Sequence, residues 1–159
     1  MEFKTRALIT LACITILTGC SPPKDAKMID RFNQKKAIFE ALVRMVGEDN
    51  FRSHLWITNL NEKPASLSDA RAKQYKALLE QADLTGIMRM DPGGKTDRII
   101  LFTKAPFLST EIKSYVHAQN PLTPLLESLD DGLHEFKPYV SYYKHIEGNW
   151  YLEYAIING

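Results

Sequence analysis

Cysteine is scarce in this sequence, and the two that occur, Cys13 and Cys20, both lie near the N-terminus. Without a thiol in the rest of the chain, disulfides, thiolate metal sites and a cysteine nucleophile are excluded there. The chain also lacks an excess of charge of one sign, because it has 20 Lys and Arg residues and 19 Asp and Glu residues. A chain without a basic excess is not expected to bind nucleic acid.

Motifs for catalysis are missing as well. The histidines never fall at the i, i+4 spacing by which two imidazoles share a zinc ion; they are His54, His117, His134 and His145. No serine lies in a glycine elbow that would present it as a nucleophile; this applies to Ser109, Ser114, Ser128 and Ser141. We therefore expect a protein that is not an enzyme and that binds no metal or cofactor.

Two short motifs resemble binding sites but are better explained as loops. The segment Gly93-Gly94-Lys95-Thr96 is similar to the end of a phosphate-binding loop, yet Arg89 stands where that motif needs its first glycine. It also leads into a strand, so a hairpin turn is predicted. The acidic pair Asp130-Asp131 is interpreted as an exposed loop and not as a cation site.

The N-terminus has the features of an export signal. Lys4 and Arg6 precede a mostly apolar run over 7–17, which is too short for a transmembrane helix of roughly 20 residues. The next residues, Leu17-Thr18-Gly19-Cys20, resemble the lipobox of bacterial lipoproteins. This resemblance implies that residues 1–19 are a signal peptide, and that Cys20 becomes the first mature residue and carries acyl chains such as palmitate.

The same resemblance implies a location and a domain organisation. Ser21 is not the aspartate that retains lipoproteins in the inner membrane, so the periplasmic face of the outer membrane is expected. Residues 20–27 are predicted to be an acylated tether, and residues 28–159 a single globular domain. Loss of the signal peptide would remove two cationic residues and one acidic residue, which leaves equal numbers of each sign.

Two helices are predicted from the spacing of apolar residues. From Asp25 to about Gly47 the apolar positions recur at helical intervals, with Gly47 as the stop signal. Ser66 and Asp69 are spaced as a helix start, and the second helix should end before Thr85. Residues 53–59 are ambiguous between a short strand and a loop.

After the helices, alternating and β-branched residues predict strands. These cover 87–90, 98–104, 110–117, 139–146 and 150–157, although 110–117 also fits a helical face. The expected fold is α+β, with two N-terminal helices followed by an antiparallel sheet of about four to five strands that ends in a hairpin. With a two-residue loop at Gly148-Asn149, Lys144 would face Glu153, and Tyr143 would face Tyr154.

The aromatic residues of this hairpin suggest how the protein acts. One face of the hairpin should be exposed, and Tyr142, Trp150 and Tyr151 are the candidate residues for contact with a protein partner. In its lipobox, its size and its lack of active-site motifs, the chain resembles small immunity lipoproteins. We expect a periplasmic lipoprotein that binds protein, as an envelope accessory or a toxin inhibitor; the alternatives are a hydrolase with a dispersed site and a carrier of an apolar ligand.

Overall fold

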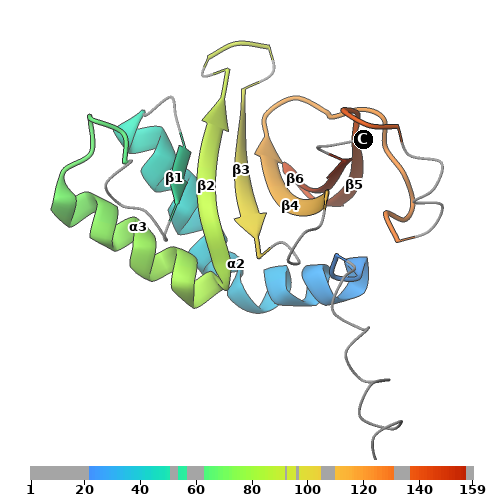
Figure 1. Cartoon of the computed structure of the whole chain (residues 1–159), viewed down its shortest axis with the longest axis horizontal. Coiled ribbons are helices and arrows are strands. Elements are labelled where there is room, and N and C mark those ends of the chain that lie inside the picture. The colour runs from blue at the N-terminus through green and yellow to red at the C-terminus, as the bar shows by residue number, and fades with distance from the viewer. Residues whose placement is uncertain are drawn as a thin grey trace, which may run out of the picture.

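The fold is a six-stranded antiparallel sheet with two helices against one face (Figure 1). The computed structural model describes residues 22–50, 54–56, 63–91, 93–95, 97–104, 110–130 and 137–156. Its elements are α2 (Asp25–Asp49), β1 (His54–Trp56), α3 (Asp69–Ala82), β2 (Leu84–Met90), β3 (Arg98–Thr103), β4 (Glu111–Ala118), β5 (Ser141–Glu147) and β6 (Trp150–Ile156). Neither described helix has the length and apolar character needed to cross a membrane.

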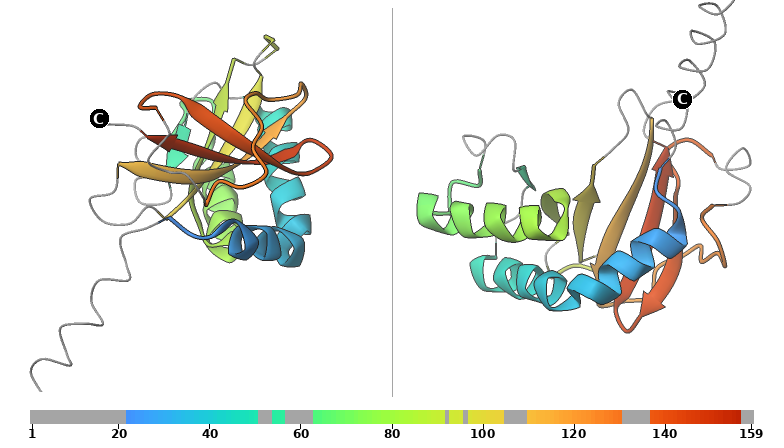
Figure 2. Two further views of the ribbon diagram at one scale, coloured as in Figure 1. Left: turned by 90° about the vertical axis from the view of Figure 1, so that its right-hand side faces the viewer. Right: turned by 90° about the horizontal axis from the view of Figure 1, so that it is seen from below.

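The α+β class, with two helices and an antiparallel sheet, is confirmed, but the order of elements differs from the expected one. The strands lie in the order β1-β2-β3-β4-β6-β5, and each pairs antiparallel with its neighbours. The three-residue strand β1 lies between the two helices in sequence and adds to the four or five strands expected. Figure 2 shows both helices on one face of the twisted sheet.

Helix α2 follows the sheet by bending at Lys35, whose φ of −119° and ψ of 17° are not helical. The prediction that Gly47 ends this helix is wrong. Helical structure continues to Asp49, because Asn50 adopts the left-handed conformation with φ of 46° and donates its N–H to the Val46 carbonyl at 2.9 Å.

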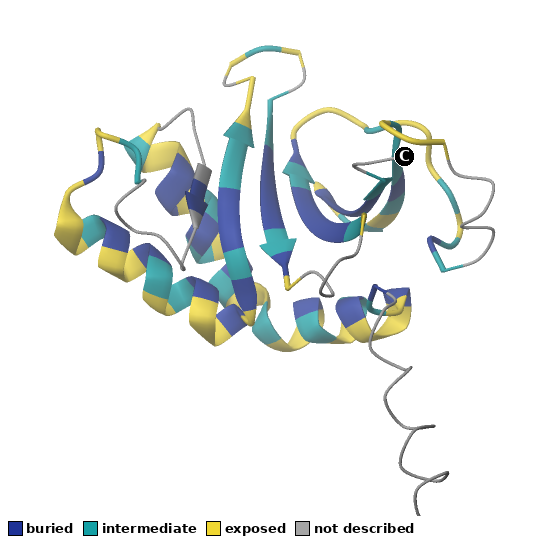
Figure 3. Ribbon diagram, in the orientation of Figure 1, coloured by how far each residue is buried: buried dark blue, intermediate teal, exposed yellow. Residues whose placement is uncertain are grey.

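Helix α3 begins later than predicted. The Ser68 hydroxyl accepts a hydrogen bond from the Arg71 amide at 3.2 Å, so Ser68 and not Ser66 caps the helix. The inward face of α3 is formed by Tyr75, Leu79 and Ala82, which are buried, together with the half-buried Leu78. Figure 3 shows this division of each helix into a buried side and an exposed side.

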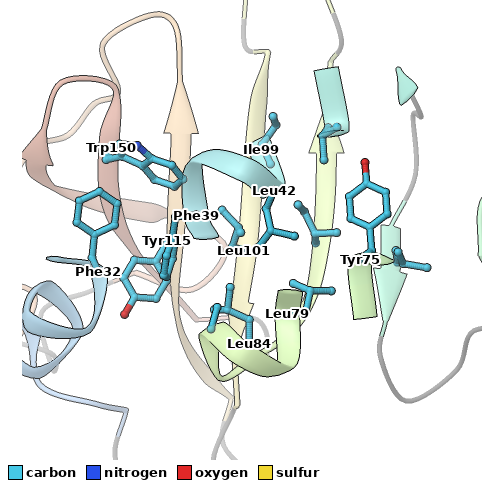
Figure 4. Packing of buried hydrophobic residues seen from close by; sticks show 14 of the residues in the cluster. Phe32, Phe39, Leu42, Tyr75, Leu79, Leu84, Ile99, Leu101, Tyr115 and Trp150 are labelled. Carbon is cyan, nitrogen blue, oxygen red and sulfur yellow. The ribbon is translucent and has the colours of Figure 1, made fainter. Parts of the chain in front are cut away.

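The main core lies between the helices and the sheet. Aromatic rings dominate one end of it, where Phe39 packs edge-on against Tyr115 with ring centroids 4.7 Å apart, and Phe32 lies 5.2 Å from Trp150 (Figure 4). A smaller core covers the opposite face of the sheet and contains Ile100, Val116, Ala118, Tyr143 and Tyr151. Both faces of the sheet therefore bury aromatic side chains.

The predicted register of β5 and β6 is wrong over most of its length. Glu147 pairs with Trp150 as expected, but the register shifts between His145 and Glu147, where Ile146 is an extra residue. Such a bulge moves every following pair by one position. Lys144 therefore faces Leu152.

This shift also changes which side chains share a face. Tyr143 pairs with Glu153, and Tyr142 pairs with Tyr154. Tyr143 and Tyr151 consequently lie in the smaller core, whereas Trp150 and Tyr154 lie in the main core.

A buried ionic cluster holds the start of α2 to the sheet. Lys113 of β4, whose side chain is only 2% exposed, donates to Asp25 at 2.8 Å and also donates to Asp130. Asp25 accepts the Leu129 amide at 2.8 Å, and its own amide donates to Asp130 at 3.0 Å. Lys144 approaches Asp25 at 3.7 Å.

The cluster corrects two expectations. Asp130 is not part of an exposed acidic loop: burial raises its pKa, but the hydrogen bonds from Lys113 and from the Asp25 amide outweigh that effect and lower it. Pro22 and Asp25 are buried, so the chain is already fixed to the domain within the range 20–27 that was predicted to be a tether.

Candidate functional site

Two hollows open on opposite faces of the sheet, at the end where β2 turns into β3 and where β4 finishes. Asp97 and Arg98 line both of them. The smaller hollow, of about 120 Å³, lies beside Val43 and Gly47 of α2. The larger, of about 200 Å³, lies on the far face under the loop after β4. Polar side chains gather here from segments that are far apart in sequence.

Arg89 and Asp97 form a two-pronged ion pair in the smaller hollow. Arg89 Nε donates to Asp97 Oδ1 at 3.0 Å, and Arg89 Nη2 donates to Oδ2 at 2.8 Å. These hydrogen bonds from Arg89 hold the pKa of Asp97 below its ordinary value, with a further contribution from the Gly93 amide at 2.9 Å. Through these hydrogen bonds, Asp97 fixes the turn between β2 and β3.

His117 lies in the same hollow and packs edge-on against Trp150, with ring centroids 5.0 Å apart. Burial lowers the pKa of His117, although the negative charges of Glu40 and Asp97 oppose this shift. Burial of the ring therefore favours its neutral form. Within the described residues it forms no hydrogen bond to a serine or threonine hydroxyl, so no nucleophile and base pair is assembled there.

Arg98 is the central residue of the larger hollow. Its Nη1 donates to the Tyr143 hydroxyl at 2.5 Å and lies 4.0 Å from Glu153 Oε1. Tyr143 in turn donates to Glu153 at 3.2 Å. Burial raises the pKa of Tyr143, and the charge of Glu153 adds to this effect. These contacts compensate the charge of the buried Glu153 and hold the Arg98 guanidinium against the sheet.

The rim of the larger hollow joins two loops. Asn120 donates from its side-chain amide to the Lys95 carbonyl at 3.0 Å, which ties the loop after β4 to the turn between β2 and β3. Residues 121–123 complete the rim. Lys95 is exposed and forms no ion pair with a described residue. Arg98 and Lys95 therefore both belong to the lining of this hollow.

The aromatic residues predicted to contact a partner are not exposed. Trp150 and Tyr151 have exposed fractions of 3% and 6% and lie in the two cores, while Tyr142 is half-buried. The expectation of an exposed aromatic face is wrong, because the main core and the smaller core cover opposite sides of β6. Partner binding by these three residues stays a prediction, and for Trp150 and Tyr151 it would need the cores to open.

Other predicted residues cannot be placed. The signal sequence and Cys20 lie outside the described residues, as do Ser109, Asp131 and His134. The described residues contain no cluster of three or more His, Cys, Asp or Glu side chains arranged to hold a metal ion. The sequence analysis did not propose Arg98 or His117 as site residues. Their neighbours in the chain do not indicate that β3 and β4 bring them to the two hollows.

No known protein family, curated protein or solved structure matches this chain.

Proposed function

We propose that the chain is a lipid-anchored lipoprotein of the bacterial envelope that acts by binding another protein. The observation that carries this proposal is the order of Lys4, Arg6, the apolar run and Cys20 in the first part of the sequence. The described fold supports it, because the helix α2 begins at Asp25, shortly after the proposed lipid attachment site.

The proposed anchor would keep the domain close to the membrane. Residues 21–24 separate Cys20 from α2, and an extended chain spans about 3.3 Å per residue, so this link reaches roughly 13 Å. Because Asp25 forms an ion pair with Lys113 of β4, the ionic cluster would hold the sheet close to the attached lipid. A partner would therefore be met near the membrane surface, on the periplasmic face of the outer membrane under this proposal.

The hollows favour binding over catalysis. Arg89 is paired with Asp97, Arg98 is paired with Tyr143, and His117 has no described hydroxyl to activate. At about 120 and 200 Å³, both hollows are smaller than the roughly 300–1,000 Å³ of typical small-molecule sites. These two hollows suit one side chain of a protein partner better than a whole substrate, whereas a third hollow of about 430 Å³, beside Leu125 and Lys144, is of small-molecule size. The partner would be an envelope protein or an incoming toxin.

Fatty-acid labelling tests the anchor. Cells that express Cys20→Ser should incorporate no labelled palmitate into the protein and should accumulate an uncleaved precursor, because the thiol is the acylation site. Cys13→Ser is the matched control, since this cysteine lies inside the predicted signal and its loss should leave the label unchanged. Label that persists on Cys20→Ser would refute the proposal.

A further inference from the structure

We propose that His117 makes the contact between the second half of α2 and the sheet sensitive to mild acid. When its imidazole takes up a proton, a form in which this half of the helix moves away from the sheet becomes more populated. The second half comprises residues 36–49, which follow the bend at Lys35. The inference concerns a conformational change, goes beyond the proposed function and does not depend on it.

The first support is the bend itself. Lys35 interrupts the helical backbone, so two helical segments meet at this residue. A few dihedral angles at such a break can move one segment relative to the other. The first segment is fixed to β4 by buried polar contacts, from Lys113 to Asp25 at 2.8 Å and from the Tyr115 hydroxyl to the Met28 carbonyl at 2.9 Å. The bend therefore allows the second half to move while the first half stays in place.

The second support is incomplete packing under the second half. The smaller hollow, of about 120 Å³, is lined by Val43 and Gly47 of α2 and by His117 and Gln119 of β4. A Cβ built on Gly47 would meet nothing within 4 Å. The hollow is polar and has room for water, which occupies about 30 Å³ per molecule in the liquid. This end of the helix consequently has fewer contacts to lose when it opens.

The third support is the state of the imidazole. Within the part of the chain that the structure describes, neither ring nitrogen of His117 has a hydrogen-bond partner. The ring packs edge-on against Trp150, with centroids 5.0 Å apart. Burial lowers the pKa of His117, so the closed form favours the neutral ring. In the open form the ring would be hydrated, and its pKa would return toward the ordinary value of 6.5.

Charged groups around the ring do not reverse this preference. They come from three elements: Glu40 of α2, Arg89 of β2, and Asp97 and Arg98 of β3. Glu40 and Asp97 favour the protonated ring, but both carboxylates are already engaged. Glu40 accepts the Trp150 indole N–H at 2.9 Å, and Asp97 is held by Arg89 at 2.8 and 3.0 Å. Neither carboxylate is hydrogen-bonded to the imidazole, so an imidazolium in the closed form would lack a partner.

The sign and size of the effect follow from the two pKa values. Above pH 6.5 the ring is neutral in both forms, and the contact has its full stability. As the pH falls below 6.5, the open form is protonated first, so its population rises by at most about tenfold per pH unit until the closed form is protonated as well. Because Phe39, Leu42 and Val46 are fully buried, the open form stays a minor population.

Hydrogen exchange of the full-length protein in detergent micelles detects such a minor form. Exchange rates are measured by NMR at roughly pH 7.5 and 5.5 and are corrected for the intrinsic effect of pH on exchange. We expect the opening equilibrium of the amides of residues 43–49 to rise by up to about tenfold at the lower pH, and that of residues 29–34 to stay unchanged. The titration midpoint of the His117 ring resonances should lie below 6.5.

Three variants test the role of the imidazole. His117→Gln keeps a polar side chain that stays neutral, and should abolish the rise. Glu40→Gln keeps an acceptor for the Trp150 indole but removes a charge that favours the protonated ring, so the rise should begin at a lower pH. His145→Gln is the matched control, because this exposed histidine of β5 lies outside the hollow, and it should leave the rise unchanged.

The inference is wrong if the exchange of residues 43–49 is unchanged or slower at the lower pH, or if the rise persists in His117→Gln. A rise of equal size in residues 29–34 would also overturn it, because it would show unfolding of the whole domain. If His117→Gln fails to fold, as near-UV circular dichroism would reveal, the shifted response of Glu40→Gln still decides. Loss of acylation at Cys20 with this acid response intact would refute only the proposed anchor.

Discussion

At the residue scale, two glycines illustrate how backbone conformation decides the effect of one substitution. Gly47 lies inside α2, and a Cβ placed there would meet nothing within 4 Å. Gly47→Ala should therefore stabilise the domain by about 0.5–1 kcal/mol, because alanine loses less backbone entropy in a helix. Gly93 has a φ of +76°, so Gly93→Ala should destabilise it. Urea unfolding of both variants measures the two effects, and a loss of stability in Gly47→Ala would contradict the helical assignment.

Asp97 is expected to contribute to the acid sensitivity of the fold. Its pKa is lowered in the folded state, chiefly by the hydrogen bonds from Arg89, relative to an ordinary value of 3.8. The stabilisation is complete well above that value and is lost as the pH falls through the lowered pKa. Unfolding free energies at neutral pH and at roughly pH 3 should differ less in Asp97→Asn than in the parent. An unchanged pH dependence would show that Arg89 does not favour the ionised form.

At the element scale, the bulge in β5 determines whether Lys144 and Glu153 interact across the two strands. Lys144 faces Leu152, and its ammonium approaches Asp25 on the helix side. A double-mutant cycle between Lys144 and Glu153 should therefore give a coupling near zero, where directly opposed charges give about 0.2–1 kcal/mol. The hydrogen-bonded pair Tyr143 and Glu153 is the positive control, with about 1 kcal/mol expected. Coupling in the first cycle would place the strands in the bulge-free register.

At the scale of the whole molecule, the ionic cluster makes Asp25 part of the folded domain, so truncation before or after this residue should affect stability differently. A chain that starts at Pro22 keeps Asp25 and should unfold like the full-length protein. A chain that starts at Met28 leaves Lys113 without its contact at 2.8 Å and the Leu129 amide without its acceptor. It should lose about 3 kcal/mol, because breaking a buried ion pair leaves an uncompensated charge.

Thermal melts of the two truncated chains compare their stabilities. Asp25→Ala in the full-length chain should reproduce the loss, and Asp30→Ala, at an exposed position of the same helix, should stay within about 0.5 kcal/mol of the parent. Equal stability of the two truncated chains would mean that the residues before Met28 are a tether after all.

Local patterns determined much of this protein from sequence alone. The start of α2, the existence of α3 and the turn at Gly93 depend on residues within a few positions of one another, so local spacing predicted them correctly, whereas the bend of α2 at Lys35 and its end at Asp49 were not predicted. The prediction of an export signal and of acylation at Cys20 likewise rests on neighbouring residues.

Only the tertiary structure decided the rest. One extra residue, Ile146, reversed the faces of β5 relative to β6. Separate cores on the two sides of the sheet buried Trp150 and Tyr151, which the alternating pattern had not indicated. Asp25 meets Lys113 across 88 residues, and Arg98 meets Tyr143 across 45. Such contacts depend on strand order and register, which arise from the summed packing of the whole sheet and not from any local preference, so the ionic cluster and the two hollows could not be predicted from the sequence.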